Sequence, residues 1–329
     1  MARAGLILDH QEVTRMNVLI TGAGLIGCHV AKRAADAGNK VVIYDLSPNR
    51  EYIDKIVGRD RAEIVAADMR DLPALLSALE RSNTDTIVAT AGLIGKRVAE
   101  NSYTGATNNI LATIHTLEAA RLRRLRRVVY VSTFGVYDRP KIKAPIREDA
   151  PIGGHNLYTT TKICSEHLVH SYTHLYDLDT VIIRPAGVFG RGHYVGGSTV
   201  GMVMRDLALK LIKGQPFALD SKVYFSNEYV YAKDVALAID LACAAKAPKQ
   251  RIYNAGSGVV TKADDLAKAA REIVPKLEVT VSGTATESHA EFPLDLSASK
   301  AELGYEPQFP LKEALRDYME DLWSEGVRG

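Results

Sequence analysis

A tyrosine and a lysine, Tyr158 and Lys162, form the clearest pair of residues in this sequence that could do chemistry. In a helix their spacing of four places both side chains on one face. A tyrosine with its ordinary pKa of about 10 is a weak base near neutral pH. A neighbouring lysine ammonium stabilises the phenolate and lowers that pKa. Tyr158 would then move the proton of a substrate hydroxyl while a hydride leaves or joins the same carbon.

Two hydroxyl side chains, Ser132 and Thr133, follow Val131 at the end of an apolar segment that is typical of a strand. Open parallel sheets bind ligands at the carboxyl ends of their strands. We therefore expect Thr133 to hold the hydroxyl or carbonyl group that Tyr158 addresses, with Ser132 as a further substrate contact. An ordinary hydroxyl at a strand end is the alternative interpretation of Thr133.

A glycine-rich turn, Gly22-Ala23-Gly24-Leu25-Ile26-Gly27, lies between the strand-like segment MNVLIT and a helix-like segment. In that context Gly22 permits a tight turn, Gly24 lets a pyrophosphate approach the backbone, and Gly27 lets the helix pack on the strand. The N–H groups at the start of the helix, Leu25 and Ile26 included, would face the phosphates. A tight turn without a ligand is the alternative.

Two acids follow at strand ends. Asp45 lies about twenty residues beyond the glycines, where a carboxylate accepts the adenosine ribose hydroxyls and repels a 2′-phosphate. It therefore favours NAD over NADP, although Arg50 is close enough in sequence to reach a phosphate. Asp68 and the adjacent Met69 are expected to meet the adenine, with a cap for the helix beginning near Asp71 as the alternative role of Asp68.

Short apolar, β-branched segments alternate with amphipathic ones, which favours an α/β fold: a Rossmann-type, doubly wound parallel sheet. The expected strands are 18–21, 41–45, 63–68, 86–90, 128–133 and 180–185, and the expected helices 25–37, 71–82, 106–121, 157–175 and 311–323. We expect an NAD-binding domain over 16–185, with returning segments near 229–256, and a smaller C-terminal substrate-binding lobe over 186–329.

These motifs, with those that follow along the chain, resemble the extended short-chain dehydrogenase/reductase family of NAD-dependent epimerases and dehydratases. The resemblance extends from Met16 almost to the C-terminus and includes VSTFGVY at 131–137, RPAGVFG at 184–190 and SKAELGY at 299–305. It implies a bound NAD, the catalytic set Thr133, Tyr158 and Lys162, and a homodimer formed by a helical bundle, here 106–121 and 157–175. It also implies cofactor contacts from Ala91, Gly92, Asn109, Val131, Pro185 and Val188.

The chain departs from the family pattern at the residues that would hold a nucleotide diphosphate. The glycine turn is one residue shorter than in most members, which leaves dinucleotide binding intact. Gly187 stands where nucleotide-sugar enzymes carry an asparagine, and Asn227-Glu228 stands where they carry Arg-Asp. A diphosphate favours a forked cationic partner. The two losses therefore favour a free sugar, sugar acid or hydroxy acid over a nucleotide sugar.

Three functions remain open at this stage. An epimerase would oxidise a hydroxyl-bearing carbon of a sugar derivative to a transient ketone and return the hydride. A dehydrogenase would release the ketone and NADH. A non-catalytic NAD-sensing protein is the third possibility, against which Thr133, Tyr158 and Lys162 argue. Dehydration is not expected, since Phe134-Gly135 replaces the Asp-Glu pair of sugar dehydratases.

The net charge, hydropathy and cysteine content of the chain argue against several classes of partner. A net charge of +2 over 329 residues gives no general reason to expect nucleic acid or an anionic membrane. No apolar segment is long enough to cross a bilayer, and three widely spaced cysteines indicate a reducing, cytoplasmic setting. The arginines clustered over 121–127 are interpreted as a solvated helix end, with anion binding as the alternative. His167, His170 and His174 are interpreted as surface residues, so no metal is expected.

One glycine-rich segment, 186–201, could close over a substrate. It carries two further candidate substrate contacts, Arg191 and His193. Arg191 would bind an acidic group of the substrate. An exposed loop histidine is the alternative interpretation of His193.

The cofactor preference can be tested at one residue. Asp45→Ala should weaken the preference for NAD over NADP, because the carboxylate that repels a 2′-phosphate is gone. Titration of both dinucleotides against the wild type and the variant measures the two preferences. An unchanged ratio, or a wild type that already prefers NADP, contradicts the assignment.

Overall fold

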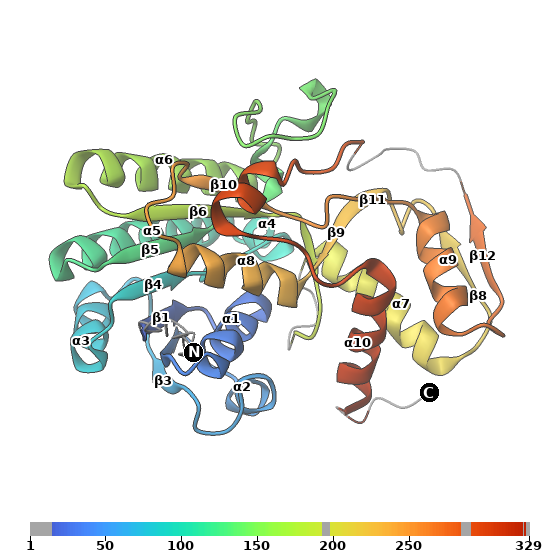
Figure 1. The fold of residues 1–329 in the computed structure, drawn as a ribbon, viewed down its shortest axis with the longest axis horizontal. Coiled ribbons are helices and arrows are strands. Elements are labelled where there is room, and N and C mark those ends of the chain that lie inside the picture. Colours follow the sequence, from blue (N-terminus) through green and yellow to red (C-terminus); the bar gives the residue numbers. More distant parts are fainter. Residues whose placement is uncertain (1–14, 193–197, 284–290, 325, 327–329) are drawn as a thin grey trace, which may run out of the picture.

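A seven-stranded parallel sheet organises the chain (Figure 1). The computed structural model describes residues 15–192, 198–283, 291–324 and 326. The strand order is β10-β6-β5-β4-β1-β2-β3. The strands are β1 (Asn17–Thr21), β2 (Lys40–Asp45), β3 (Glu63–Ala66), β4 (Thr86–Ala89), β5 (Arg127–Val131), β6 (Thr180–Pro185) and β10 (Ile252–Ala255). The chain winds outward from β1 in both directions, so the predicted doubly wound α/β fold is confirmed.

Helices cover both faces of this sheet because its strands alternate buried side chains between the faces. Val18 and Ile20 of β1 face the core under one set of helices, α1 (Leu25–Asp36), α2 (Arg50–Val57) and α8 (Ala232–Ala244). Leu19 faces the opposite core, under α3 (Leu72–Ser82), α5 (Ser102–Arg123) and α6 (Leu157–Tyr176). The short helix α4 (Lys96–Glu100) follows β4. The point where the winding reverses lies between β1 and β4, and this is where such sheets bind ligands.

A smaller lobe with its own hydrophobic core lies beside the sheet, on the right in Figure 1. It contains α7 (Thr199–Lys213), β8 (Phe217–Asp220), α9 (Ala263–Ile273), β12 (Val279–Ser282) and α10 (Leu311–Ser324). A three-stranded sheet consists of β7 (Gly187–Phe189), β9 (Asn227–Tyr231) and β11 (Val260–Thr261). It lies between the lobe core and the sheet core that contains Val18. Short helical turns are η1 (Phe134–Val136), η2 (Arg139–Lys141) and η3 (Ser299–Leu303).

Three predicted strands end earlier than expected, and for the strand predicted over 86–90 the difference is one residue, since β4 ends at Ala89. The strand predicted over 63–68 ends at Ala66, since the chain turns where Asp71 N donates to the Asp68 carbonyl at 3.0 Å. The strand predicted over 128–133 ends at Val131, because the Thr133 hydroxyl accepts from Gly135 N at 3.1 Å and starts the η1 turn. Asp68 and Thr133 therefore lie on turns beyond their strands.

A buried ion pair attaches α6 to the sheet. The guanidinium of Arg184 on β6 donates to both carboxylate oxygens of Glu166 on α6, at 3.0 and 2.6 Å. It also donates to the Glu148 carbonyl at 2.9 Å and lies over the ring of Tyr137. Buried charges are tolerated only when paired and hydrogen-bonded in this way. The pair therefore fixes the position of α6 along the direction of β6.

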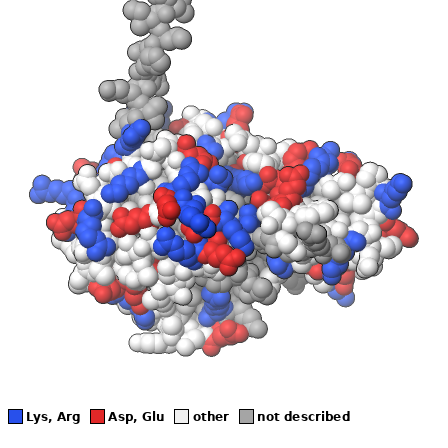
Figure 2. Space-filling view, turned by 90° about the horizontal axis from the view of Figure 1, so that it is seen from below, with Lys and Arg blue, Asp and Glu red and all other residues white. Residues whose placement is uncertain are grey.

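Most of the clustered arginines pair with carboxylates. Arg121 pairs with Glu118, Arg123 with Glu80 and Arg126 with Asp85. The interpretation as a solvated helix end is wrong for Arg127, which is buried and holds Asp179 at 2.6 Å. Figure 2 shows basic and acidic side chains mingled over the face that it draws. None of the helices in the described ranges is both long and apolar enough to span a membrane.

Candidate active site

Helix α6 places the predicted Tyr158 and Lys162 at the end of β5. Asn156 caps the helix: its side chain accepts from Thr159 N at 2.9 Å, while the Thr159 hydroxyl accepts from Asn156 N at 3.2 Å. This reciprocal capping box fixes where the helix begins. Tyr158 consequently lies in the first turn, and Lys162 lies one turn further along the same face.

The ammonium of Lys162 is buried and anchored on β5. It donates to the Val131 carbonyl at 2.8 Å and to the Tyr130 hydroxyl at 3.2 Å. Burial acts to lower the pKa of Lys162, but the phenols of Tyr130 and Tyr158 favour the charged form, and the pKa is held above its ordinary value. The charged form of Lys162 is therefore favoured at a position where it interacts electrostatically with Tyr158.

Tyr158 and Thr133 are brought together as predicted from the sequence. Burial holds the pKa of Tyr158 above its ordinary value, and Lys162 and a hydrogen bond with the Thr133 side chain offset only part of that rise. The expectation that Lys162 brings this pKa below its ordinary value is therefore wrong, because burial outweighs the charge. Ser132, immediately before Thr133, is buried and its hydroxyl has no hydrogen-bond partner among the described residues. The structure therefore brings Tyr158, Lys162 and Thr133 together at the end of β5, with the unpaired Ser132 hydroxyl next to Thr133 in the chain.

The glycine turn has the shape that a dinucleotide phosphate requires. Gly22 has φ of +88°, and a Cβ on Gly27 would lie 1.9 Å from the Gly22 carbonyl oxygen. A Cβ on Gly24 would meet no atom of the described residues within 4 Å, so these residues leave the space above it open. Gly24 is the N-cap residue of α1 and has no side chain to accept from the first N–H groups of the helix. The first turn also contains no acidic residue. The N–H groups from Leu25 and Ile26 onward are therefore suited to an anion.

Asp45 lies at the end of β2 beside this turn. Its carboxylate accepts from Ala23 N at 2.7 Å and from Ser47 N at 2.8 Å, so it holds the turn against the strand. Arg50, the possible phosphate partner, instead has its guanidinium 3.8 Å from Asp60. A carboxylate fixed in this position fits the ribose of NAD.

Asp68 and Met69 occupy the turn after β3. The Asp68 carboxylate pairs with Arg70 at 2.6 Å, and this pairing lowers its pKa. Asp71, not Asp68, caps α3, since its side chain accepts from Ala74 N at 3.0 Å. The alternative role considered for Asp68 is therefore excluded. The Met69 carbonyl pairs with His115 Nδ1 at 2.8 Å.

Asn109 supports the loop after β4 rather than leaving its amide free. The amide accepts from Leu93 N at 2.8 Å and donates to the Leu93 carbonyl and the Thr161 hydroxyl at 3.0 and 3.2 Å. Ala91 N donates to the Thr21 hydroxyl at 3.2 Å, and Gly92 lies against the Asn109 amide. The loop beside the glycine turn is thereby joined to α6.

The remaining candidates lie where β6 continues into the lobe. Pro185 ends β6, and Val188 lies in β7. Arg191 is buried, with its guanidinium 3.7 Å from Asp321 of α10 and its carbonyl accepting from Tyr52 at 2.8 Å. It joins the two lobes through these contacts. His193 lies outside the described residues.

A cavity of about 360 Å³ next to Thr133 contains residues that the sequence analysis missed. Its lining includes Phe134, Arg139, Ser198, Thr199, Lys222 and Asn227. Phe134 directly follows Thr133 in the chain, so the cavity begins one residue beyond the candidate catalytic threonine. No motif surrounds Arg139 or Lys222, and only the departure noted at Asn227 pointed to this region.

The residue after Asn227 does not share in this cavity. Glu228 is buried and accepts from Leu294 N at 2.7 Å and Gly258 N at 2.8 Å. Burial raises the pKa of its carboxyl group to about 7. Glu228 therefore clamps two loops and does not take the place of a ligand-binding acid.

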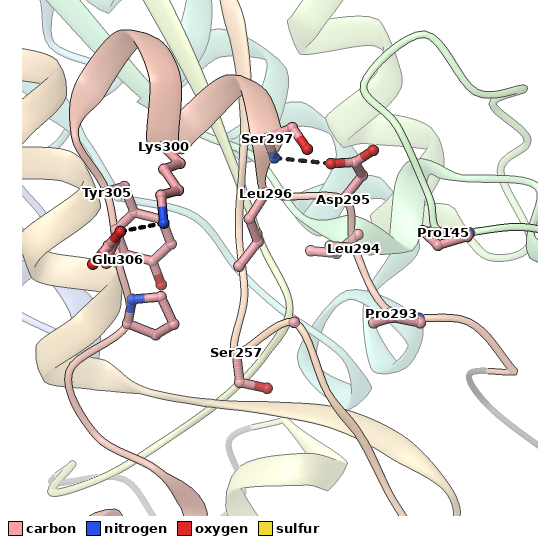
Figure 3. Close-up of a pocket in the computed structure, with 12 residues that line it drawn as sticks. Pro145, Ser257, Pro293, Leu294, Asp295, Leu296, Ser297, Lys300, Tyr305 and Glu306 are labelled. Atoms are coloured by element: carbon pink, nitrogen blue, oxygen red, sulfur yellow. Dashed lines mark hydrogen bonds and ion pairs between the residues drawn. The ribbon is translucent and has the colours of Figure 1, made fainter.

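A second cavity, of about 600 Å³, lies near η3 (Figure 3). Figure 3 shows Lys300 and Glu306 pointing toward each other, and Asp295 turned toward Ser297 N. The lining contains none of the candidate catalytic or cofactor residues, and its lysine, Lys300, is paired with Glu306. We therefore do not assign the reaction to it.

Two glycine substitutions should separate ligand binding from folding. Gly24→Ala should leave thermal stability unchanged but abolish NAD binding, since its methyl enters only the open space where the pyrophosphate would lie. Gly27→Ala should also lower the free energy of unfolding, by about 1–3 kcal/mol or more, because its methyl meets a backbone oxygen. Thermal unfolding and NAD titration measure both. Full NAD affinity in Gly24→Ala would contradict this placement of the phosphates.

Comparison with known proteins agrees with this geometry. The profile of the NAD dependent epimerase/dehydratase family matches residues 18–256. A UDP-glucose 4-epimerase from Mycolicibacterium smegmatis is 31% identical over 93% of this chain and 98% of its own length.

Solved structures share the fold at lower identity. A UDP-glucose 4-epimerase from Thermotoga maritima superposes with a TM-score of 0.81 at 22% identity, covering 94% of this chain and 99% of that one. An L-threonine dehydrogenase from Cupriavidus necator superposes with a TM-score of 0.79 at 21% identity, covering 93% and 99%. With the glycine turn, Asp45 and the Tyr158–Lys162 pair in place, this chain belongs to the NAD-dependent epimerase/dehydratase family, the extended short-chain dehydrogenases/reductases.

Proposed function

We propose that this enzyme epimerises a hydroxyl-bearing carbon of a sugar derivative, using NAD and passing through a transient ketone. The observation that carries the proposal is the meeting of Tyr158, Thr133 and Lys162 at the end of β5. The 31% identity to a UDP-glucose 4-epimerase over nearly the whole chain supports epimerisation.

Tyr158 is the proton carrier in this proposal. Its phenolate accepts the proton of the substrate hydroxyl as the carbon is oxidised, and its hydroxyl returns the proton when the ketone is reduced. The buried Lys162 charge stabilises the phenolate in between. Thr133 and Ser132 donate hydrogen bonds to the same substrate oxygen, which holds it in place during both half-reactions.

The residues that would hold NAD are those of the glycine turn and the neighbouring strand ends. We place the pyrophosphate over Gly24 and the first turn of α1, and the adenosine ribose at Asp45. The adenine would lie near Asp68 and Met69, and the nicotinamide near Val131, Pro185 and Val188. Bound NAD supplies the hydride acceptor for the oxidation and the hydride donor for the reduction.

A dehydrogenase that releases the ketone and NADH is the second candidate. It would use Tyr158, Lys162 and Thr133 in the same way and differs only in whether the reduced cofactor leaves. The observation that favours it is the likeness in fold to L-threonine dehydrogenase. Net production of NADH separates the two candidates.

Removing one hydroxyl should stop the reaction. Tyr158→Phe should lower kcat by about 10²–10⁴-fold, the range lost with a general acid–base group, and retain NAD binding. Proton NMR of UDP-sugars, free sugars, aldonates and uronates with NAD follows the product, with the exposed Tyr103→Phe as the control. A new stereoisomer without NADH is the expected result. NADH that increases in step with a ketone product supports the dehydrogenase. A Tyr158→Phe variant that functions like the wild type supports the third possibility, a non-catalytic NAD-sensing protein.

We also propose a homodimer formed through α5 and α6. These two helices pack against each other on the sheet and expose large apolar side chains, namely Tyr103 and Leu122 on α5 and Leu157, Leu175 and Tyr176 on α6. Apolar side chains gathered on neighbouring helices favour an interface. A second copy of the pair would complete a four-helix bundle.

Charge placed on this surface should separate the subunits. The double variant Leu122→Glu/Leu175→Glu should run as a monomer, because both positions are at least half exposed on the proposed interface. Size-exclusion chromatography with light scattering gives the mass. Met202→Glu, at an exposed apolar position on α7, is the control and should remain dimeric. A monomeric wild type contradicts the proposal.

A further inference from the structure

The cavity beside Thr133 has a cationic lining. Arg139 of the η2 turn and Lys222 both line it, and none of the described residues that line it is acidic. The guanidinium of Arg139 lies over the ring of Phe134, 5.0 Å from its centroid, and its buried Nη1 has no hydrogen-bond partner among the described residues. Burial lowers the pKa of Arg139, although a guanidinium stays charged. A buried, unpaired donor of this kind is costly unless an anion accepts from it.

Asn227 brings a second unsatisfied atom to the same cavity. Its side chain is 1% exposed. The amide donates from Nδ2 to the Glu228 carbonyl at 3.2 Å, and its buried Oδ1 has no partner in the part of the chain that the structure describes. Such an oxygen accepts from a hydroxyl or N–H group of a ligand.

Gly187 is the reason that Asn227 can occupy this position. A Cβ on Gly187 would lie 2.3 Å from Asn227 Nδ2, so no larger residue fits there while the amide keeps its place. The two departures from the family pattern are therefore one change. An amide has moved from strand β7 to the neighbouring strand β9, and β9 has lost its arginine.

The start of α7 also lines this cavity. Ser198 caps this 15-residue helix by accepting from Gly201 N at 3.0 Å, and Thr199 and Val200 in its first turn line the cavity. The first N–H groups of a helix and its dipole favour negative charge. The helix start and Arg139 thus act on the same space.

We propose that Arg139 is the specificity-determining cation of this enzyme: it binds the diphosphate of a nucleotide-sugar substrate, while Asn227 Oδ1 accepts from a substrate hydroxyl or N–H group. This inference rests on the proposed function and names its substrate class. Arg139 takes the role of the arginine that β9 lacks, from a different element of the fold. The expectation that the lost contacts favour a substrate without a nucleotide is then reversed. A free neutral sugar gives the buried guanidinium no anion to bind.

Binding of UDP to the NAD-loaded enzyme tests this assignment. Isothermal titration calorimetry should show that Arg139→Gln weakens UDP binding by about 10- to 100-fold, as expected for a charged hydrogen-bonded contact. Lys141→Gln is the matched control, since Lys141 lies in the same η2 turn, is exposed and pairs with Asp138. Unchanged thermal unfolding and unchanged NAD affinity show that each variant is folded.

A substitution of equal shape at Asn227 gives an independent measurement. Asn227→Asp keeps the size of the side chain but places negative charge beside the ligand. The loss of UDP affinity relative to the wild type should therefore be larger at low salt than at high salt, because salt screens the repulsion. A cavity that binds only neutral groups would not show this salt dependence, and that result would overturn the assignment.

Failure of this inference differs from failure of the proposed function. Turnover of a free sugar or sugar acid without UDP binding, or UDP binding that Arg139→Gln does not alter, overturns the role of Arg139 and leaves epimerisation standing. UDP binding that depends on Arg139, with no stereoisomer formed from any nucleotide sugar, supports the cavity and overturns epimerisation.

Discussion

The hydrogen bond from the Lys162 ammonium to the Val131 carbonyl is the contact on which the active site depends. It joins the catalytic face of α6 to the last residue of β5. Because the charge is buried, it stays fixed where it can act on the Tyr158 hydroxyl. The capping box at Asn156 and the Arg184–Glu166 pair hold the same helix at two other points. Together these contacts remove the sliding and rotation that would separate Tyr158 from Thr133.

Local rules were sufficient to predict the sheet and the centre of the site. The glycines at 22, 24 and 27 mark a turn whose crowding at Gly27 and openness at Gly24 follow from backbone geometry alone. Tyr158 and Lys162 share a face because of the helical period. Strand ends were predicted less well: Thr133 lies on a turn beyond its strand because its own hydroxyl stabilises that turn.

Contacts between distant segments could not be predicted in this way. The exchange between Gly187 and Asn227 spans forty residues and is visible only once β7 and β9 lie side by side. Read separately, each residue indicates a lost contact. Arg139 carries no motif, and its importance comes from the burial of a guanidinium beside a cavity. Asn109, which the family resemblance places at the cofactor, has a role that the sequence did not indicate: its side chain supports the loop after β4.

The described residues form three hydrophobic cores, one on each face of the sheet and one in the lobe, and the cavity beside Thr133 lies where the lobe core meets one of the two sheet cores. Phe134 belongs to the sheet side of this boundary, whereas Val200 and Phe225 belong to the core of the lobe. The residues proposed to transfer the proton all lie on the sheet side of this boundary, on α6 and just beyond β5. Selection can therefore alter the lobe wall, and with it the compound that is recognised, without moving Tyr158 or Lys162. The residues for the reaction and the residues for substrate recognition can therefore evolve at different rates.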